Sequence, residues 1–148
     1  MTDINHDDLL EMRQDNIGRL FQRAARAYSE LALEKFKKYG YEDLSLFHTA
    51  LISNLDVEGS QISTIAERAG VSKQAMGQLA KELEAKGLIQ RVPDPSDKRA
   101  VLLKFTDDGI KFLEVAYQIK LEIESEYADI IGDENMLILR DLLGQLVR

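Results

Sequence analysis

The chain has 148 residues, of which 45% are hydrophobic and 30% charged, as expected for one globular domain with a real core. It contains no cysteine, which excludes a disulfide framework, a thiolate nucleophile, a Cys-ligated metal and a thiol redox sensor. No apolar run approaches the ~18 residues of a membrane span. The acidic start MTDINHDDLLEM does not resemble a secretory signal, so we expect a cytoplasmic protein.

The net charge of −7 is unevenly distributed. Residues 72–104 contain seven basic and four acidic side chains, a net charge of +3, whereas the rest of the chain has 12 basic and 22 acidic residues, a net charge of −10. A basic segment in an acidic body indicates a localised surface for a polyanion. Chance clustering would give the same counts, so the charge distribution alone leaves both interpretations open.

A long helix over residues 8–38 is the first predicted element, and Gly40 is expected to end it. Its apolar side chains recur at three- and four-residue steps. They form a stripe too long for one small neighbour to cover, which favours packing on a partner. The stripe contains Ile17, Leu20, Phe21, Ala24, Tyr28, Leu31 and Phe36.

Three shorter helices are predicted next. Ser45 caps the first, which reaches about Leu55. Its expected buried side chains are Leu46, Phe47, Ala50, Leu51 and Leu55. Two further helices, at 64–69 and 73–86, are capped by Ser63 and Ser72 and separated by Gly70, with Val71 expected in the core and Gly87 as the final stop. A helix, a glycine turn and a second helix are typical of a helix-turn-helix.

The pattern then changes to two strands, at 88–92 and 100–105, joined by a turn-rich tip over 93–99 that holds both prolines. Two more helices follow: one capped by Thr106 and reaching about residue 129, and one capped by Asp133. Their expected apolar stripes are Ile110, Leu113, Tyr117 and Leu121, and Met136, Leu139, Leu143, Leu146 and Val147. We therefore predict a mainly α fold with a two-stranded antiparallel β wing.

The helix at 73–86 has a face suited to DNA. Met76, Leu79, Ala80 and Leu83 share one side, and Gln74, Gln78 and Lys81 lie opposite, flanked by Lys73, Gly77 and Ala75. Amide side chains can bridge adenine N6 and N7, and a lysine can reach guanine or phosphate. Ser72 could contact phosphate at the helix start. Taken alone, this polar face is also typical of any helix exposed to solvent. The preceding helix and tight turn favour the interpretation that it recognises DNA.

Two further features of this region remain ambiguous. Arg99 at the wing tip could enter a minor groove, with Asp97 holding its guanidinium and Lys98 or Arg91 on phosphate; a solvated charged turn would look the same. Gly77 should lower helix stability by roughly 0.5–1 kcal/mol relative to alanine. Close approach to DNA or to a neighbouring helix would explain it, and so would a tolerated accident.

Four motifs in this order carry a resemblance: STIAERAGVSK at 63–73, LEAKGLIQR at 83–91, PSDKRAV at 95–101 and FTDDG at 105–109. Over residues 44–116 the chain resembles the winged helix-turn-helix core of the MarR (multiple antibiotic resistance regulator) family. The resemblance implies one domain over 1–148, in which helices at 8–39 and 107–148 form a homodimer and residues 44–106 bind DNA. The family's wing positions fall on Asp97 and Arg99, and its recognition-helix start on Ser72, Lys73 and Gln74.

Such proteins bind palindromic double-stranded operators, with the recognition helix in the major groove and the wing in the minor groove. Many are repressors released by small, often phenolic or anionic, ligands bound between the dimer helices and the winged region. This sequence departs from the family at Gly77, where a bulkier residue is common, so an operator preference cannot be transferred. The absence of cysteine excludes the thiol-based, peroxide-sensing branch as a model.

Other candidate sites are weak. His6 beside Asp7 and Asp8 is better explained as a solvated start than as a metal site. A ligand cavity, if present, could use Tyr28, Phe36, Tyr39, Phe47 and His48, although aromatic residues at helical spacing are usually core. No catalytic constellation or cofactor motif is present, so we expect no enzyme. The rival interpretations are a winged helix used for protein contacts and a small enzyme.

Overall fold

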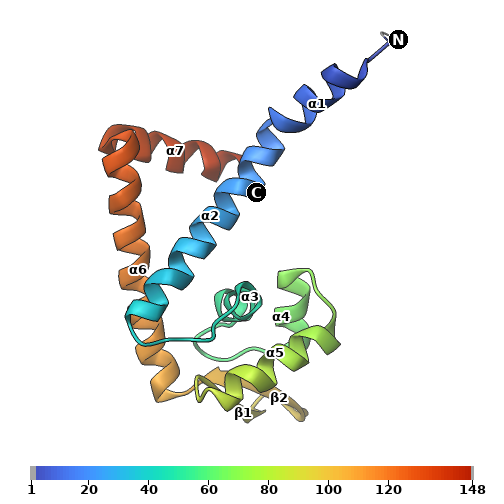
Figure 1. Cartoon of the computed structure of the whole chain (residues 1–148). Coiled ribbons are helices and arrows are strands. Elements are labelled where there is room, and N and C mark those ends of the chain that lie inside the picture. The colour runs from blue at the N-terminus through green and yellow to red at the C-terminus, as the bar shows by residue number, and fades with distance from the viewer. Residues whose placement is uncertain (1–2, 148) are drawn as a thin grey trace.

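The computed structural model describes residues 3–147. Figure 1 shows helices and one hairpin within these residues. In chain order they are α1 (His6–Gln14), α2 (Ile17–Lys38), α3 (Leu46–Asn54), α4 (Ile62–Ala69), α5 (Lys73–Ala85), β1 (Ile89–Asp94), β2 (Asp97–Phe105), α6 (Asp107–Ile131) and α7 (Asp133–Leu146). This is the predicted mainly α architecture with a two-stranded antiparallel sheet.

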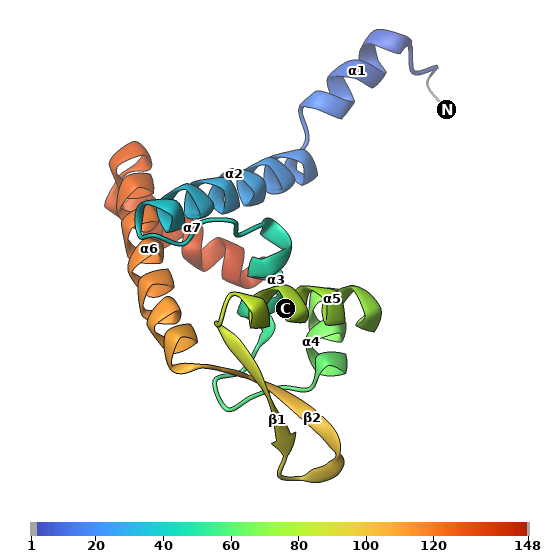
Figure 2. The same ribbon diagram turned by 60° about the horizontal axis from the view of Figure 1, so that its bottom comes forward.

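The predicted single helix at 8–38 is wrong, because the chain breaks at Asp15 and Asn16. The Asn16 side chain accepts a hydrogen bond from the Arg19 amide at 2.8 Å and donates one to the Met12 carbonyl at 3.0 Å. An asparagine that binds nearby backbone in this way favours a cap over a helix interior. As a result α1 is a separate helix that projects from the body in both views (Figures 1 and 2).

Helices α3, α4 and α5 pack on one another, and α4 and α5, separated by the turn at Gly70, form the helix-turn-helix. The left-handed turn residues Gly70 and Gly87 have φ of 69° and 76°, as predicted. Below the helices, β1 and β2 contribute to the same core. Its most deeply buried members in this region are Leu51, Ile65, Met76, Ala80, Leu83 and Leu103.

Several details of this core differ from the prediction. Helix α4 begins two residues early, with Gln61 rather than Ser63 at its N-cap. Val71 is 41% exposed and does not insert into the core. Phe47 is 70% exposed, and Leu46 is exposed too, because the buried face of α3 follows residues 48, 51, 52 and 55. That i, i+3, i+4, i+7 spacing leaves position 47 about 100° away.

The wing strands extend further toward the tip than predicted. They pair from Ile89↔Phe105 to Pro93↔Val101, and an irregularity after Pro93 brings Asp94 opposite Asp97. The predicted seven-residue tip at 93–99 therefore shrinks to a turn at Pro95 and Ser96. Proline is tolerated in β1 because this strand has a neighbour on one side only.

Helix α6 begins where the wing ends, capped by Thr106 as predicted. Thr106 Oγ1 accepts a hydrogen bond from the Gly109 amide at 2.9 Å and donates one to the Gly87 carbonyl at 2.6 Å. The buried residues of α6 are Gly109, Phe112, Ile119 and Ile123. Phe112 stacks on Phe36 of α2, with ring centroids 4.8 Å apart. This contact joins the two long helices, which meet along the C-terminal half of α2 and diverge toward α1 (Figure 1).

The predicted apolar stripes of the last two helices are largely exposed in the single chain. Ile110, Tyr117 and Leu121 on α6 are exposed, and Tyr117 reaches 65%. On α7, Leu139, Leu143, Leu146 and Val147 are also exposed. The N-cap of α7 is Gly132, not Asp133. Apolar periodicity identified surfaces that avoid water, but not whether the same chain covers them.

Candidate nucleic-acid interface

The orientation of α5 is fixed at its start and along its inner face. Ser72 Oγ accepts a hydrogen bond from the Ala75 amide at 3.1 Å, which satisfies a first-turn donor. Met76, Ala80 and Leu83 have no exposed surface. The anchored inner face leaves the opposite side chains in solvent, among them Gln74, Gln78 and Lys81.

That outer face borders an open groove of about 720 Å³. Its walls come from three elements, since Ile62 at the start of α4 and Arg91 of β1 meet the residues of α5 there. The structure thus brings together seven of the ten predicted DNA-contact residues, with Gly77 and Ile62 in addition. The seven are Ser72, Lys73, Gln74, Ala75, Gln78, Lys81 and Arg91.

Two acidic side chains near the groove are already bonded to other side chains of the protein. Glu84 accepts a hydrogen bond from Arg91 Nε at 2.8 Å, so Arg91 is already paired. Glu82 Oε2 lies 2.6 Å from Nε2 of the buried His48. In contrast, four of the five basic residues predicted to contact DNA are exposed and form no ion pair within residues 3–147. They are Lys73, Lys81, Lys98 and Arg99.

The His48–Glu82 contact ties the start of α3 to α5. His48 Nδ1 accepts a hydrogen bond from the Ser45 amide at 3.0 Å, so a neutral ring must carry its proton on Nε2 and donate it to Glu82. That hydrogen bond holds the pKa of Glu82 below its usual range. His48 is therefore a positioning residue between two helices, a role that its sequence context did not reveal.

The wing tip is organised by two aspartates. Asp97 Oδ1 accepts a hydrogen bond from the backbone amide of Arg99 at 2.9 Å, which corrects the prediction that it holds the guanidinium. Asp94 is buried and accepts hydrogen bonds from Gln61 Nε2 at 2.9 Å and from the amide and hydroxyl of Ser96. These bonds lower the pKa of Asp94. They also fix the hairpin to the start of α4.

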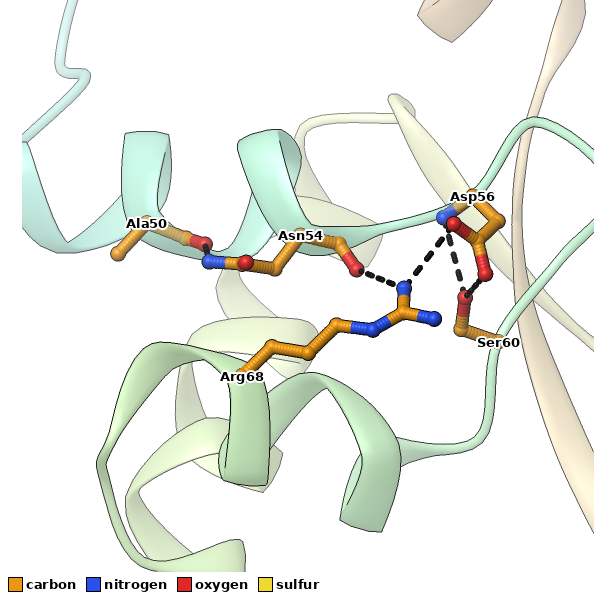
Figure 3. Close-up of polar contacts among 5 residues, drawn as sticks. All are labelled: Ala50, Asn54, Asp56, Ser60 and Arg68. Atoms are coloured by element: carbon orange, nitrogen blue, oxygen red, sulfur yellow. Dashed lines mark hydrogen bonds and ion pairs between the residues drawn. The ribbon is translucent and has the colours of Figure 1, made fainter. Parts of the chain in front are cut away.

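A second polar cluster holds α4 against α3, as Figure 3 shows. Arg68 Nη1 donates to the Asn54 carbonyl and to Asp56 Oδ1, both at 3.0 Å. The Ser60 hydroxyl donates to Asp56 Oδ2 and accepts from the Asp56 amide, each at 3.0 Å. Ser60 then pairs with Leu103 of β2 through two backbone hydrogen bonds of 3.0 and 2.8 Å. The loop between α3 and α4 therefore joins the helix-turn-helix to the wing.

A cavity of about 570 Å³ lies between α2, α3 and α6. Tyr28 and Phe36 line it, but the other three predicted ligand residues do not. Tyr39 donates a hydrogen bond to Glu122, Phe47 points into solvent and His48 is bound to Glu82. The polar lining residues, which sequence reasoning missed, are Ser29, Thr49, Ser53 and Lys120. They sit among apolar neighbours at ordinary helical spacing, which carries no distinguishing signal.

Ion pairs also join α2 to α6 outside the cavity. The buried ammonium of Lys35 contacts Glu126 and lies 3.5 Å from Glu122. The hydrogen bond to Glu126 raises the pKa of Lys35, and the hydrogen bond from Tyr39 lowers that of Glu122. Within residues 3–147, no cluster of three or more His, Cys, Asp or Glu side chains could hold a metal ion. No helix in that range is both long and apolar enough to span a membrane.

A helix-turn-helix followed by a two-stranded wing defines the winged-helix class of DNA-binding proteins. The fold matches the reduced form of MarR from E. coli with a TM-score of 0.77 and 21% identity, covering 90% of this chain and 98% of that one. It also matches the YusO protein from Bacillus subtilis with a TM-score of 0.63 and 25% identity, covering 96% of each chain.

Sequence comparison gives the family. A family model described as MarR family matches residues 43–100. The chain is 33% identical over 144 residues to the HTH-type transcriptional repressor MdtR of Bacillus subtilis, covering 96% of this chain and 88% of that protein. It is 32% identical over 87 residues to the HTH-type transcriptional regulator FarR of Neisseria gonorrhoeae, covering 57% and 58%. The chain belongs to the MarR family of DNA-binding transcriptional regulators, which are not enzymes.

Proposed function

We propose that this protein is a cytoplasmic, homodimeric repressor that binds palindromic double-stranded DNA and is released by a small aromatic or anionic ligand. The observation that carries the proposal is the arrangement of exposed, unpaired cations. Lys73 and Lys81 flank the outer face of α5, and Lys98 and Arg99 lie at the tip of the hairpin beside it. In both views the hairpin lies at the end of the molecule remote from α1 (Figures 1 and 2).

We assign base recognition to the outer face of α5. Gln74 and Gln78 stand one helical turn apart and are exposed, so both amides can address adjacent base edges in a major groove. Lys73 and Lys81 would contact phosphate or guanine. Ser72 and the first amides of α5 would contact phosphate, and Ala75 presents a small apolar contact.

The wing would hold the neighbouring backbone and minor groove. Arg99 is exposed and its backbone is fixed by Asp97, so the side chain projects from a defined position. A guanidinium of this kind is attracted to a narrow minor groove, where the potential is most negative. Lys98 and Arg91 would contact phosphate. Arg91 must share its guanidinium with Glu84 to do so, because these two side chains are already paired.

The exposed apolar surface of the terminal helices supports a homodimer. The proposed dimerisation segments, 8–39 and 107–148, carry large apolar side chains that the single chain leaves in solvent, whereas residues 44–106 would bind DNA. A surface this apolar on several adjoining helices is typical of an obligate interface. Its members include Leu9, Leu10, Ile17, Leu20, Phe21, Tyr117, Leu121, Leu139, Leu142, Leu143 and Leu146.

The cavity supports regulation by a ligand. It lies between the helices proposed to dimerise and α3 of the winged region, so an occupant would contact both. Aromatic walls from Tyr28 and Phe36 suit an aromatic ring, and Lys120 could pair with an anionic group. A ligand would weaken DNA binding if it binds more tightly to a conformation in which the two recognition helices no longer match the spacing of the half-sites. A coupling free energy of roughly 1–3 kcal/mol between ligand binding and DNA binding is typical.

The test of DNA binding is selection from a pool of random duplexes with the wild-type protein, followed by fluorescence anisotropy on the selected and scrambled duplexes. We expect a palindromic sequence whose affinity falls with salt. Arg99→Ala should weaken binding and reduce the salt slope by about two, because each dimer has two wings. Arg26→Ala, an exposed arginine of α2 paired with Glu30, is the matched control. Salt-independent or non-selective binding would instead favour a protein partner.

Ligand relief needs its own test. Benzoate, a small aromatic carboxylate, should raise the Tm and release the selected duplex, and Lys120→Met should weaken both effects. Phenol tests whether a charge is needed. If neither compound at millimolar concentration raises the Tm or releases DNA, the ligand part of the proposal is wrong.

A further inference from the structure

Gly77 lies in the middle of α5 and interrupts an otherwise good helix-forming sequence. A glycine in a helix interior lowers stability relative to alanine, because it has more backbone freedom to lose. Two ordinary reasons for a glycine, a positive φ and a lack of space for a side chain, do not apply at Gly77. Gly77 is not among the glycines with positive φ. Apart from the two neighbouring residues and the backbone of its own helix, a Cβ added at Gly77 would meet no atom within 4 Å.

The open space around Gly77 is the groove proposed to receive DNA. Gly77 lies in the groove wall one helical turn from Lys73 on one side and from Lys81 on the other. Gln74 and Gln78 border the same groove. The helix backbone is therefore bare at one flank of the proposed recognition face, next to the long side chains of Lys73, Gln74, Gln78 and Lys81.

We infer that Gly77 is a specificity-determining residue because its missing side chain lets α5 lie deep in the major groove. This inference rests on the proposed function. A methyl group at position 77 would stand between the helix and the base edges and hold α5 away from them. The amide contacts of Gln74 and Gln78 would then lengthen beyond the range of a good hydrogen bond. In a symmetric dimer the loss occurs in both half-sites.

The inference predicts opposite effects on folding and on binding. Gly77→Ala and Gly77→Leu should leave the Tm unchanged or raise it by roughly 2–4 °C, since both residues favour a helix and a Cβ at this position enters open space. Affinity for the duplex selected by the wild type should fall roughly tenfold for alanine and further for leucine. Binding to scrambled duplex should change much less, because phosphate contacts dominate it.

Gly144→Ala is the matched control, because Gly144 of α7 is also helical, is open to an added Cβ in the single chain, and lies about 100° around the helix from Leu143 of the proposed dimer surface. Its affinity for the selected duplex should equal that of the wild type. The inference is overturned if Gly77→Ala binds within about threefold of wild type, or if both alanine variants lose affinity equally. If the wild type itself selects no sequence, the proposed function fails and this inference with it. Selective binding by the wild type with an unaffected Gly77→Ala refutes only the role of Gly77.

Discussion

Gly109→Ala should strongly destabilise the fold, because this glycine sits where α6 passes the end of the winged region. A Cβ at position 109 would lie 2.0 Å from the Leu88 carbonyl oxygen and 3.2 Å from Cβ of Phe105. Carbon and carbonyl oxygen normally approach to about 3.3 Å, so the start of α6 would have to move by more than ~1 Å. The same carbonyl accepts a hydrogen bond from the Thr106 amide at 3.1 Å, which such a movement would break.

The expected cost follows from these contacts. Overpacking of a buried site costs about 1–3 kcal/mol, and the two hydrogen bonds of Thr106 to Leu88 and Gly87 add about 0.5–1.5 kcal/mol each. The better helix propensity of alanine returns roughly 0.5–1 kcal/mol. We therefore expect a net loss of about 3 kcal/mol in the free energy of unfolding.

Urea unfolding followed by circular dichroism at fixed protein concentration measures this loss. The midpoint should fall by about 1–2 M. Gly77→Ala, which places the same methyl group in open space, should show no such fall. A Gly109→Ala midpoint equal to that of the wild type would refute the close approach of α6 to Leu88 and the reasoning built on it.

Three further predictions concern other parts of the molecule. Ser72→Ala removes the cap of α5 and should lower stability by about 1 kcal/mol in the same urea assay; an unchanged midpoint would show that water replaces the hydroxyl. Leu143→Glu places a charge on the proposed dimer surface and should give a monomer by light scattering, whereas Gln145→Glu should remain dimeric. The pKa of Asp56 lies below 3.8 because Arg68 and Ser60 donate hydrogen bonds to it. Its contribution to stability is therefore present above that value and lost as pH falls through the folded-state pKa, and Asp56→Asn should flatten the acid-side loss in urea midpoints below about pH 4.

The sequence predicted the elements whose signals are local. Gly70 and Gly87 marked helix ends through their backbone freedom, and Ser72 and Thr106 marked helix starts through their hydroxyls. The break at Asn16 was missed because the apolar stripe that defined the helix begins only at Ile17, so its spacing carried no information on residues 8–16. Periodicity reports which side chains avoid water, whereas a cap depends on a single residue.

The candidate site was predictable to a similar extent. The exposed face of α5 follows directly from the positions of Met76, Ala80 and Leu83, so its outer residues were correctly placed. What the sequence could not show were contacts between distant segments. Glu82 with His48 and Asp94 with Gln61 join residues more than 30 positions apart, and no local pattern links them. Only the folded structure shows that Glu82 and Asp94 are bonded to His48 and Gln61 and are therefore engaged away from the proposed DNA-binding face of α5.

The continuity of α6 has a mechanical consequence. This helix has 25 residues and is capped by Thr106. The Thr106 hydroxyl is hydrogen-bonded to the Gly87 carbonyl just after α5, and α7 packs against α6 further along. At 1.5 Å per residue it is roughly 37 Å long. A tilt of about 5° at one end would displace the other by roughly 3 Å, close to the rise of about 3.4 Å between successive base pairs. A small rotation at the end of α6 that leads into α7 would therefore shift the recognition helix by nearly one base-pair step along the DNA.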